Sequence, residues 1–242
     1  MNAERFERAR RKMTAGRERV GIGTLGEKTV HAVLKEYYGG GEESKEITVG
    51  GFVADAVTEE GIVEIQTRAL YRLNRKLETL LPVCRVTVVY PLESEKYLLT
   101  IDPESGELIS RRKSPKKIGL WQGVAELYGI RDKLKDENLT VRFPLLTVEE
   151  LRLPAKGKGR GRRAEKLDRL PLAMTGEYVL RNADDYRALL PRELPEEFTA
   201  EDFAMLCRTN TDTARRCIGV LCVLGIAAET GKQGRKKLWK IT

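Results

Sequence analysis

The chain has 242 residues, which suits one large or two modest domains, and its 41% hydrophobic content is enough to build a core. Its 44 basic and 36 acidic residues give a net charge of +8, which favours a polyanionic partner, most simply nucleic acid. No apolar run approaches the roughly 20 residues of a membrane span. The basic N-terminus lacks an apolar signal segment, so we expect a cytoplasmic protein.

Residues 1–23 are rich in arginine, and Phe6, Ala9 and Met13 give only a thin helical stripe among the charges. We treat this segment as a basic N-terminal arm. It could neutralise phosphates, but a solvated helix or a disordered leader fits the thin stripe better.

The stretch from Thr24 to Gln66 predicts one helix followed by three short strands. The helix, Leu25–Tyr38, has an apolar stripe, and Glu27 and His31 share the edge of that stripe because residues four apart lie on one helix face. A capping box formed by Thr24 and Glu27 would explain the glutamate without any chemistry.

Strands Phe52–Val57 and Ile62–Thr67 carry acidic residues where a plain core would have apolar ones. The turn between them pairs Val57 with Ile62, and so places Asp55 opposite Glu64 with Cβ atoms about 5 Å apart. Two opposed carboxylates are destabilising unless a cation such as Mg²⁺ neutralises them. The alternative is that the acidic residues stand there because this face of the strands is exposed to solvent.

A glutamate on a helix, an aspartate on a strand and a following Glu-x-Gln, in αβββαβ order, resemble the signature of the PD-(D/E)XK nuclease superfamily. The resemblance covers residues 24 to about 90. It implies a restriction-endonuclease-like α/β core with a mixed sheet, in which Mg²⁺ or Mn²⁺ is bound by Asp55, Glu64 and the carbonyl of Ile65. It also implies that Gln66 positions water and that Glu27 holds a further water or a second metal.

Two positions depart from that signature. Ala54 stands where the signature has proline, and Gln66 replaces the lysine that orients water and stabilises the transition state. Some members are active with glutamine there, and others recruit a basic residue from the next helix. The candidates for that residue are Arg68, Arg72 and Lys76.

The chain then predicts helix Ala69–Leu81, a central strand Arg85–Tyr90, a hairpin of Lys96–Ile101 with Glu107–Arg112, helix Gly119–Leu134 and strand Leu139–Leu146. Helix Gly119–Leu134 is expected to turn Trp121, Val124, Ala125, Tyr128 and Leu134 inward. We assign residues 24–153 to the nuclease-like domain. A basic loop after the hairpin is placed to bind phosphates; its cations are Arg111, Arg112, Lys113, Lys116 and Lys117.

Residues 155–163 alternate glycine with cations and cannot bury a core, so residues 154–195 are predicted to be a basic linker and connector with a short helix at Asp184–Leu190.

Residues 196–242 predict helix Ala200–Cys207 capped by Thr199, a second helix Thr211–Leu224, and a hairpin with a basic tip. This order resembles a winged-helix domain, which implies that the second helix enters the major groove and that the wing lies on phosphates. The DNA-contacting residues would be Asn210, Thr211, Thr213, Arg215 and Arg216 on the helix, Lys232, Arg235, Lys236 and Lys237 on the wing, and Arg68 and Arg72 beside the acidic strands. Winged helices also bind proteins, and that alternative stays open.

The sequence therefore predicts a metal-dependent DNA endonuclease targeted by a winged helix. A non-catalytic DNA-binding transcriptional regulator with a degenerate nuclease-like scaffold is the alternative. RNA processing and a homodimer are also left open.

Overall fold

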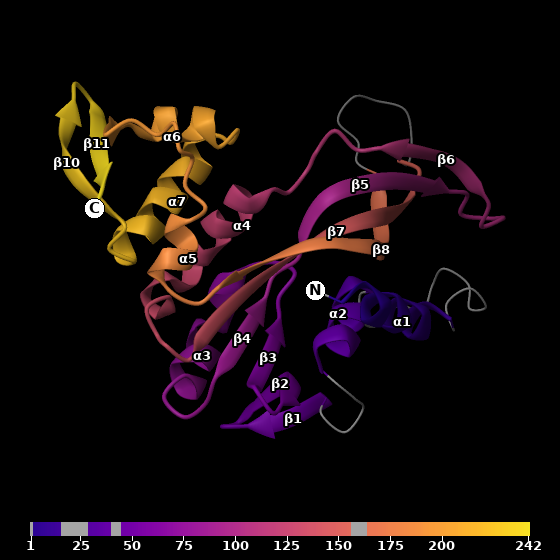
Figure 1. Ribbon diagram of the computed structural model, residues 1–242. Coiled ribbons are helices and arrows are strands. Elements are labelled where there is room, and N and C mark those ends of the chain that lie inside the picture. The colour runs from indigo at the N-terminus through magenta and orange to yellow at the C-terminus, as the bar shows by residue number, and fades with distance from the viewer. Residues whose placement is uncertain (1, 16–28, 40–44, 156–163) are drawn as a thin grey trace.

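The computed structural model describes residues 2–15, 29–39, 45–155 and 164–242. Its centre is an eight-stranded mixed sheet in the order β1-β2-β3-β4-β7-β5-β6, with β8 paired to β7 (Figure 1). The strands are β1 (Lys45–Val49), β2 (Phe52–Thr58), β3 (Gly61–Ile65), β4 (Val86–Val89), β5 (Leu92–Ile101), β6 (Leu108–Lys113), β7 (Leu139–Leu153) and β8 (Glu165–Leu180). The architecture is α/β, as predicted.

Strand β7 is the element that joins the sheet together. Its first part runs parallel to β4, its later part runs parallel to β5, and β8 pairs antiparallel with nearly its whole length. Because a strand has two edges and β8 spans both parts, β4 and β5 follow one another along the opposite edge. The predicted central strand is confirmed as β4, which lies between β3 and β7 and whose three valines are buried.

Helices α1 (Ala3–Thr14) and α2 (Thr29–Gly39) cover one face of this sheet, on the opposite side of the β7–β8 pair from α4 and α7 (Figure 1). The expectation of a solvated or disordered N-terminal arm is wrong for α1. Phe6 and Ala9 are only 2% and 3% exposed, and the Phe6 ring packs edge-on against Tyr37 with 5.7 Å between centroids. A stripe of Phe6, Ala9 and the partly buried Met13 is enough here because α2 supplies the aromatic partner.

The other face carries η2 (Leu70–Leu73), α3 (Asn74–Leu80), α4 (Leu120–Glu126) and η3 (Leu127–Lys133). The predicted helix Ala69–Leu81 is confirmed as η2 and α3. The predicted helix Gly119–Leu134 stops being α-helical at Glu126, and its 3₁₀ continuation η3 contains a non-helical residue, Ile130, with φ −126°. Tyr128 was predicted to face inward but is 38% exposed, whereas the other four predicted residues are buried.

The connector predicted for residues 154–195 contains a long strand that the sequence analysis missed. Residues 165–180 form β8, which extends the main sheet beside β7. Only the short helix of this region was anticipated, and it is α5 (Ala183–Arg187). Of the glycine-rich stretch, residues 156–163 lie outside the described part of the chain.

The C-terminal unit contains β9 (Glu197–Phe198), α6 (Ala200–Leu206), α7 (Thr211–Val223), β10 (Ala227–Gln233) and β11 (Lys236–Ile241), and its three strands pair in the order β10-β11-β9. The predicted cap is present, since Thr199 accepts a hydrogen bond from the Asp202 N–H. Asn210 caps α7 in the same way by accepting a hydrogen bond from the Thr213 N–H, which was not predicted.

This unit is packed on α4 through a shared hydrophobic core. The Trp121 ring of α4 meets Phe203 of α6 edge to face, with 5.0 Å between centroids. The Cys217 thiol of α7 donates a hydrogen bond to the Trp121 carbonyl at 3.1 Å. The core therefore continues from the main sheet into the C-terminal elements. In the described part of the chain, no helix has the length and apolarity required to traverse a bilayer.

We expect Phe203→Ala to lower the free energy of unfolding of the whole chain by about 3–5 kcal/mol, because it opens a cavity in this shared core. Urea denaturation followed by tryptophan fluorescence and by far-UV circular dichroism checks this, since Trp121 and Trp239 report on the two units. Met205→Ala is the control, because Met205 lies on the same helix and is 72% exposed. An earlier, separate transition of Trp239 would contradict the shared core.

Candidate acidic site

The hairpin of β2 and β3 sets the geometry of the site. Val57 pairs with Ile62 and Ala56 with Val63, which confirms the predicted register. Gly61 has φ +124°, and a Cβ on it would lie 2.3 Å from the Arg85 carbonyl oxygen, so only glycine fits this turn against β4. Continued by one pair, the register places Asp55 opposite Glu64.

The regular ladder between the two strands ends just before that pair. The N–H groups of Ile62 and Gln66 donate to β4, so the alternate N–H of Ile65 points towards β2. There it meets the side chain of Asp55, whose Oδ2 accepts the hydrogen bond at 2.8 Å. The Asp55 carboxylate thus takes the place of a backbone carbonyl where β2 and β3 part.

Asp55 is also in contact with helix α2. The Nε2 atom of His31 lies 3.4 Å from Asp55 Oδ2, and both side chains are 23% exposed. Burial alone would raise the pKa of Asp55, but the hydrogen bonds from His31 and from the Ile65 N–H outweigh it, so the pKa lies below its ordinary value. Asp55 is therefore ionised at neutral pH.

Glu64 is paired with Lys76 of α3. The Nζ atom of Lys76 lies 2.5 Å from Glu64 Oε1, and it also donates to the Val53 carbonyl at 2.6 Å. The two side chains are 5% (Glu64) and 12% (Lys76) exposed. Of the three bases that the sequence offered on the segment after β3, Lys76 is therefore the one in contact with a site carboxylate, whereas Arg68 and Arg72 are exposed.

The charge of Glu64 is only partly compensated. Burial raises the pKa of Glu64 above its ordinary value, and the negative charge of Asp55 adds to this effect, although Lys76 opposes it. The charge of Asp55 therefore acts on Glu64, although the ladder of β2 and β3 ends before the predicted Asp55–Glu64 pair and the two carboxylates contact different helices, α2 and α3. A hard cation would relieve this repulsion, and carboxylate oxygens are the ligands that Mg²⁺ prefers, so the pair fits such an ion.

The remaining predicted site residues stand differently. The Gln66 side chain donates from Nε2 to the Ala69 carbonyl at 3.4 Å, where Ala69 has a left-handed backbone with φ 53°. Glu27 lies outside the described residues. Within the described ranges, no three His, Cys, Asp or Glu side chains are grouped so that they could hold a metal ion. The contact of His31 with Asp55 was not predicted; its signal was its place on the same edge of the helix as Glu27.

The cations predicted to bind DNA fall into two groups. One group is committed to partners within the chain: Arg111 to Glu149 and the Tyr97 ring, Lys113 to Glu95, Arg215 to Asp212, Lys236 to Glu201 and Lys237 to Glu229. The other group forms no ion pair within the described ranges, and its members, exposed like those of the first group, are Arg68, Arg72, Arg112, Lys116, Lys117, Arg216, Lys232 and Arg235. Asn210 caps α7, and Thr211 and Thr213 in its first turn are half-buried.

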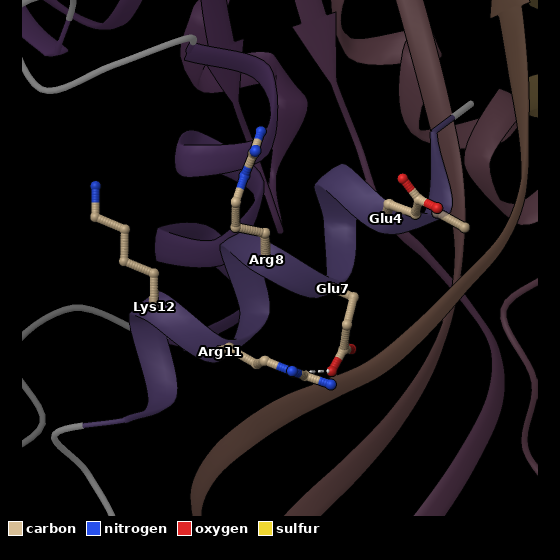
Figure 2. A pocket seen from close by; sticks show the side chains of 6 residues that line it. Glu4, Glu7, Arg8, Arg11 and Lys12 are labelled. Carbon is tan, nitrogen blue, oxygen red and sulfur yellow. Dashed lines mark hydrogen bonds and ion pairs between the residues drawn. The ribbon is translucent and has the colours of Figure 1, made fainter.

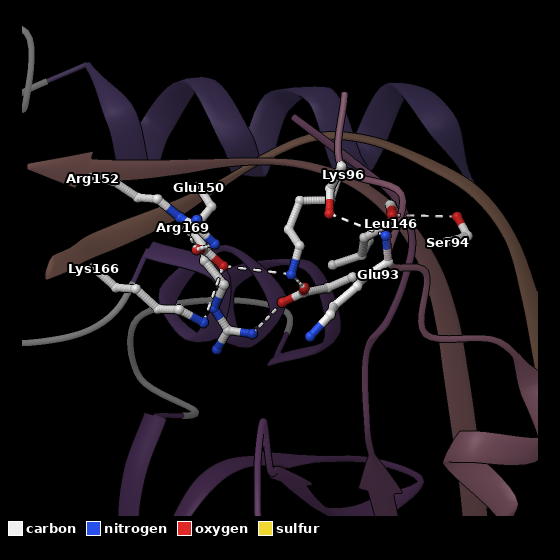
Figure 3. A network of polar contacts seen from close by, with 10 residues as sticks. Glu93, Ser94, Lys96, Leu146, Glu150, Arg152, Lys166 and Arg169 are labelled. Atoms are coloured by element: carbon white, nitrogen blue, oxygen red, sulfur yellow. Dashed lines mark hydrogen bonds and ion pairs between the residues drawn. The ribbon is translucent and has the colours of Figure 1, made fainter. Parts of the chain in front are cut away.

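A second charged cluster, which the sequence did not reveal, lies on β5, β7 and β8 (Figure 3). In this cluster, two buried carboxylates, Glu93 and Glu150, form ion pairs with four cations, which are Lys96, Arg152, Lys166 and Arg169. Burial opposes ionisation of both glutamates, but the hydrogen bonds and charges of these cations outweigh it and lower both pKa values. The two carboxylates of this cluster are therefore fully compensated by cations, which outnumber them, in contrast to Glu64 of the acidic site.

A hollow on the surface of α1 is separate from both clusters. It is lined by Ala3, Glu4, Glu7, Arg8, Arg11 and Lys12, all on that helix (Figure 2). Glu7 pairs with Arg10 and Arg11 along the helix. These are ordinary pairs at helical spacing on a solvent-facing surface.

We expect Lys76→Met to lower the free energy of unfolding at pH 7 by about 3 kcal/mol, because it leaves the Glu64 carboxylate buried without a cation. The loss should vanish in acid. Without Lys76 the pKa of Glu64 should rise further, so the loss is absent in acid, where Glu64 is protonated in both proteins, and grows as pH rises through the raised pKa values of this buried carboxyl group.

Urea titrations across this pH range measure the effect, with Arg75→Met, at an exposed position on the same helix, as the control. A loss that does not depend on pH would contradict the ion pair.

Comparison with known proteins places the sequence of this chain in a family. The sequence model of the family described as Domain of unknown function (DUF8091) matches residues 28–181. An uncharacterized protein of Treponema pallidum (strain Nichols) is 32% identical over 224 residues, which cover 90% of this chain and 87% of the relative. No solved structure gives a significant match. The family match includes His31, Asp55, Glu64 and Lys76 and ends before the C-terminal unit.

Proposed function

The chain belongs to this family, whose description assigns no activity, and we propose from its own residues that it is a metal-dependent nuclease acting on phosphodiester bonds of DNA. One observation carries the proposal. Asp55 and Glu64, on neighbouring strands that part at this point, lie close enough for the charge of Asp55 to raise the pKa of Glu64, and Lys76 is paired with Glu64 beside them.

The order of elements supports the same proposal. Helix α2, strands β1, β2 and β3, helix α3 and strand β4 follow one another in the αβββαβ order of the PD-(D/E)XK superfamily. In that superfamily the acidic residues stand on the second and third strands, as Asp55 and Glu64 do here.

In the proposed mechanism, Asp55 and Glu64 would hold Mg²⁺ or Mn²⁺ through their oxygens. A cation bound there would supply charge stabilisation at the phosphate and lower the pKa of a bound water. Asp55 is held ionised and oriented by the Ile65 N–H, so it is ready as a ligand. Lys76 takes the part of the missing signature lysine, with its ammonium group next to Glu64. Gln66 donates its amide N–H to Ala69 and can offer the amide oxygen to a water.

The C-terminal unit would deliver the DNA. Its order β9, α6, α7, β10, β11 resembles that of a winged helix, in which α7 would enter the major groove and the β10–β11 hairpin would be the wing. The exposed cations Arg216, Lys232 and Arg235 suit contacts with phosphates.

A second candidate is a DNA-binding regulator without catalysis. It is favoured by Gln66, which turns its amide N–H to the Ala69 carbonyl, and by Lys76, which already occupies Glu64. According to this alternative, the domain with the parted strands is a scaffold, and the function is DNA binding by the C-terminal unit.

Purified protein should cleave DNA in the presence of Mg²⁺ or Mn²⁺, and Asp55→Ala should reduce cleavage to background because it removes a metal ligand. Lys76→Gln should slow cleavage roughly 10²-fold by removing charge stabilisation. Gel assays on supercoiled, linear and single-stranded substrates measure this. Glu60→Gln at the exposed tip of the β2–β3 turn is the control and should cleave normally. Wild-type binding without cleavage on every substrate and with both metals would favour the regulator.

Arg216→Ala should weaken DNA binding, and the slope of log affinity against log salt should shrink by about 0.9, the value for one lost phosphate contact. Fluorescence anisotropy over a salt series measures both. Arg187→Ala, an exposed cation on α5, is the matched control and should change neither. An unchanged affinity for Arg216→Ala would indicate that this unit serves a protein partner instead.

A further inference from the structure

Three elements that are distant in sequence meet between the C-terminal unit and the acidic site. Helix α7 contacts η3, and η3 contacts η2. Segment η2 directly follows the Gln66–Ala69 contact at the end of β3. The surface of η3 thus connects α7 with the segment that leaves the acidic strands.

Two close contacts of glycine with tyrosine join these elements. A Cβ on Gly219 of α7 would lie 2.6 Å from the Tyr128 ring of η3. A Cβ on Gly129 of η3 would lie 2.9 Å from the Cβ of Tyr71 on η2. Asn74 adds a hydrogen bond from its Nδ2 to the Gly129 carbonyl at 2.6 Å. Because glycine has no side chain, α7 can approach η3 at Tyr128, and η3 can approach η2 at Tyr71.

Both tyrosines are open to solvent. Tyr71 is 59% exposed and Tyr128 is 38% exposed, and in the described ranges they are the only exposed large aromatic side chains. The guanidinium group of Arg131 stacks over the Tyr128 ring at 4.2 Å from the centroid. Exposed rings of this kind are the surfaces on which unpaired bases stack.

The charge on these elements is positive. The cations on η2, η3 and the first half of α7 are Arg72, Arg131, Lys133, Arg215 and Arg216, and the carboxylates are Asp132 and Asp212. Asp132 lies 3.9 Å from Arg131, and Asp212 lies 3.1 Å from Arg215. Arg215 and Arg216 precede Gly219, which meets the Tyr128 ring, by about one turn of α7. Cations beside stacking rings are the combination that single strands require.

We propose that Tyr128 and Tyr71, with Arg131 and Arg72 beside them, form a binding tract for single-stranded DNA that runs from α7 across η3 to η2. This inference rests on the proposed nuclease function only where it states in which direction the bound strand runs, because the tract would lead an unpaired strand towards Asp55 and Glu64. The substrate would then be DNA with an unpaired stretch next to a duplex held by the C-terminal unit.

Anisotropy titrations of the full chain with a fluorescein-labelled thymidine oligonucleotide, in EDTA so that no cleavage occurs, test the tract. Tyr71→Ala and Tyr128→Ala should each weaken binding roughly tenfold, the amount typical of one lost stacking ring. Tyr71→Phe and Tyr128→Phe keep the rings and should bind like the wild type. Val83→Ala removes a 75% exposed apolar side chain elsewhere and should have no effect. Thermal melts establish that every variant is folded.

Unchanged binding of both alanine variants, or equal losses for alanine and phenylalanine, would overturn the proposal. Binding of the corresponding RNA oligonucleotide but not of DNA would overturn it as well. If stacking-dependent binding is found and cleavage is absent under all metal conditions, the tract stands and the nuclease proposal fails.

Discussion

The hydrogen bond from the Ile65 N–H to the Asp55 carboxylate is the contact on which the acidic site depends. It lets β2 and β3 part without leaving a strand N–H unsatisfied, and a buried donor without a partner would cost about 1–3 kcal/mol. It also keeps Asp55 ionised and directed towards β3. The same parting leaves room for Lys76 to reach both Glu64 and the Val53 carbonyl from α3. The Asp55 carboxylate, which takes the place of a backbone acceptor, thus lies in one site with Glu64 and Lys76.

The hairpin could be predicted from the sequence because its signals are local. The glycine at the turn and the alternation of the flanking residues define one register, and Val57 does pair with Ile62. The strand β8 could not be predicted in this way. Its pairing with β7 is interrupted at three places, near Leu145, Thr147 and Leu151, and each irregularity shifts which residues face the core. Alternation therefore breaks down along the strand, and a glycine-rich stretch before it imitates a linker.

The site was partly predictable for a related reason. Asp55 and Glu64 follow from strand register, whereas the choice of Lys76 over Arg68 and Arg72 depends on how η2 and α3 turn after Ala69. That turn uses a left-handed residue that is not glycine, which no sequence pattern indicated. The burial of α1 was missed because its apolar stripe is narrow, and its significance appears only when Tyr37 of α2 is placed beside Phe6.

The packing of α4 against α6 and α7 has a consequence for where this protein can be divided. The family match ends at residue 181, but the hydrophobic core does not, because Trp121 and its neighbours on α4 are covered by Phe203 and Cys217. A fragment that stopped at that boundary would expose an apolar surface normally hidden from water, which is a liability for solubility. The boundary inferred from sequence relationship and the smallest stable piece of the chain are therefore different things.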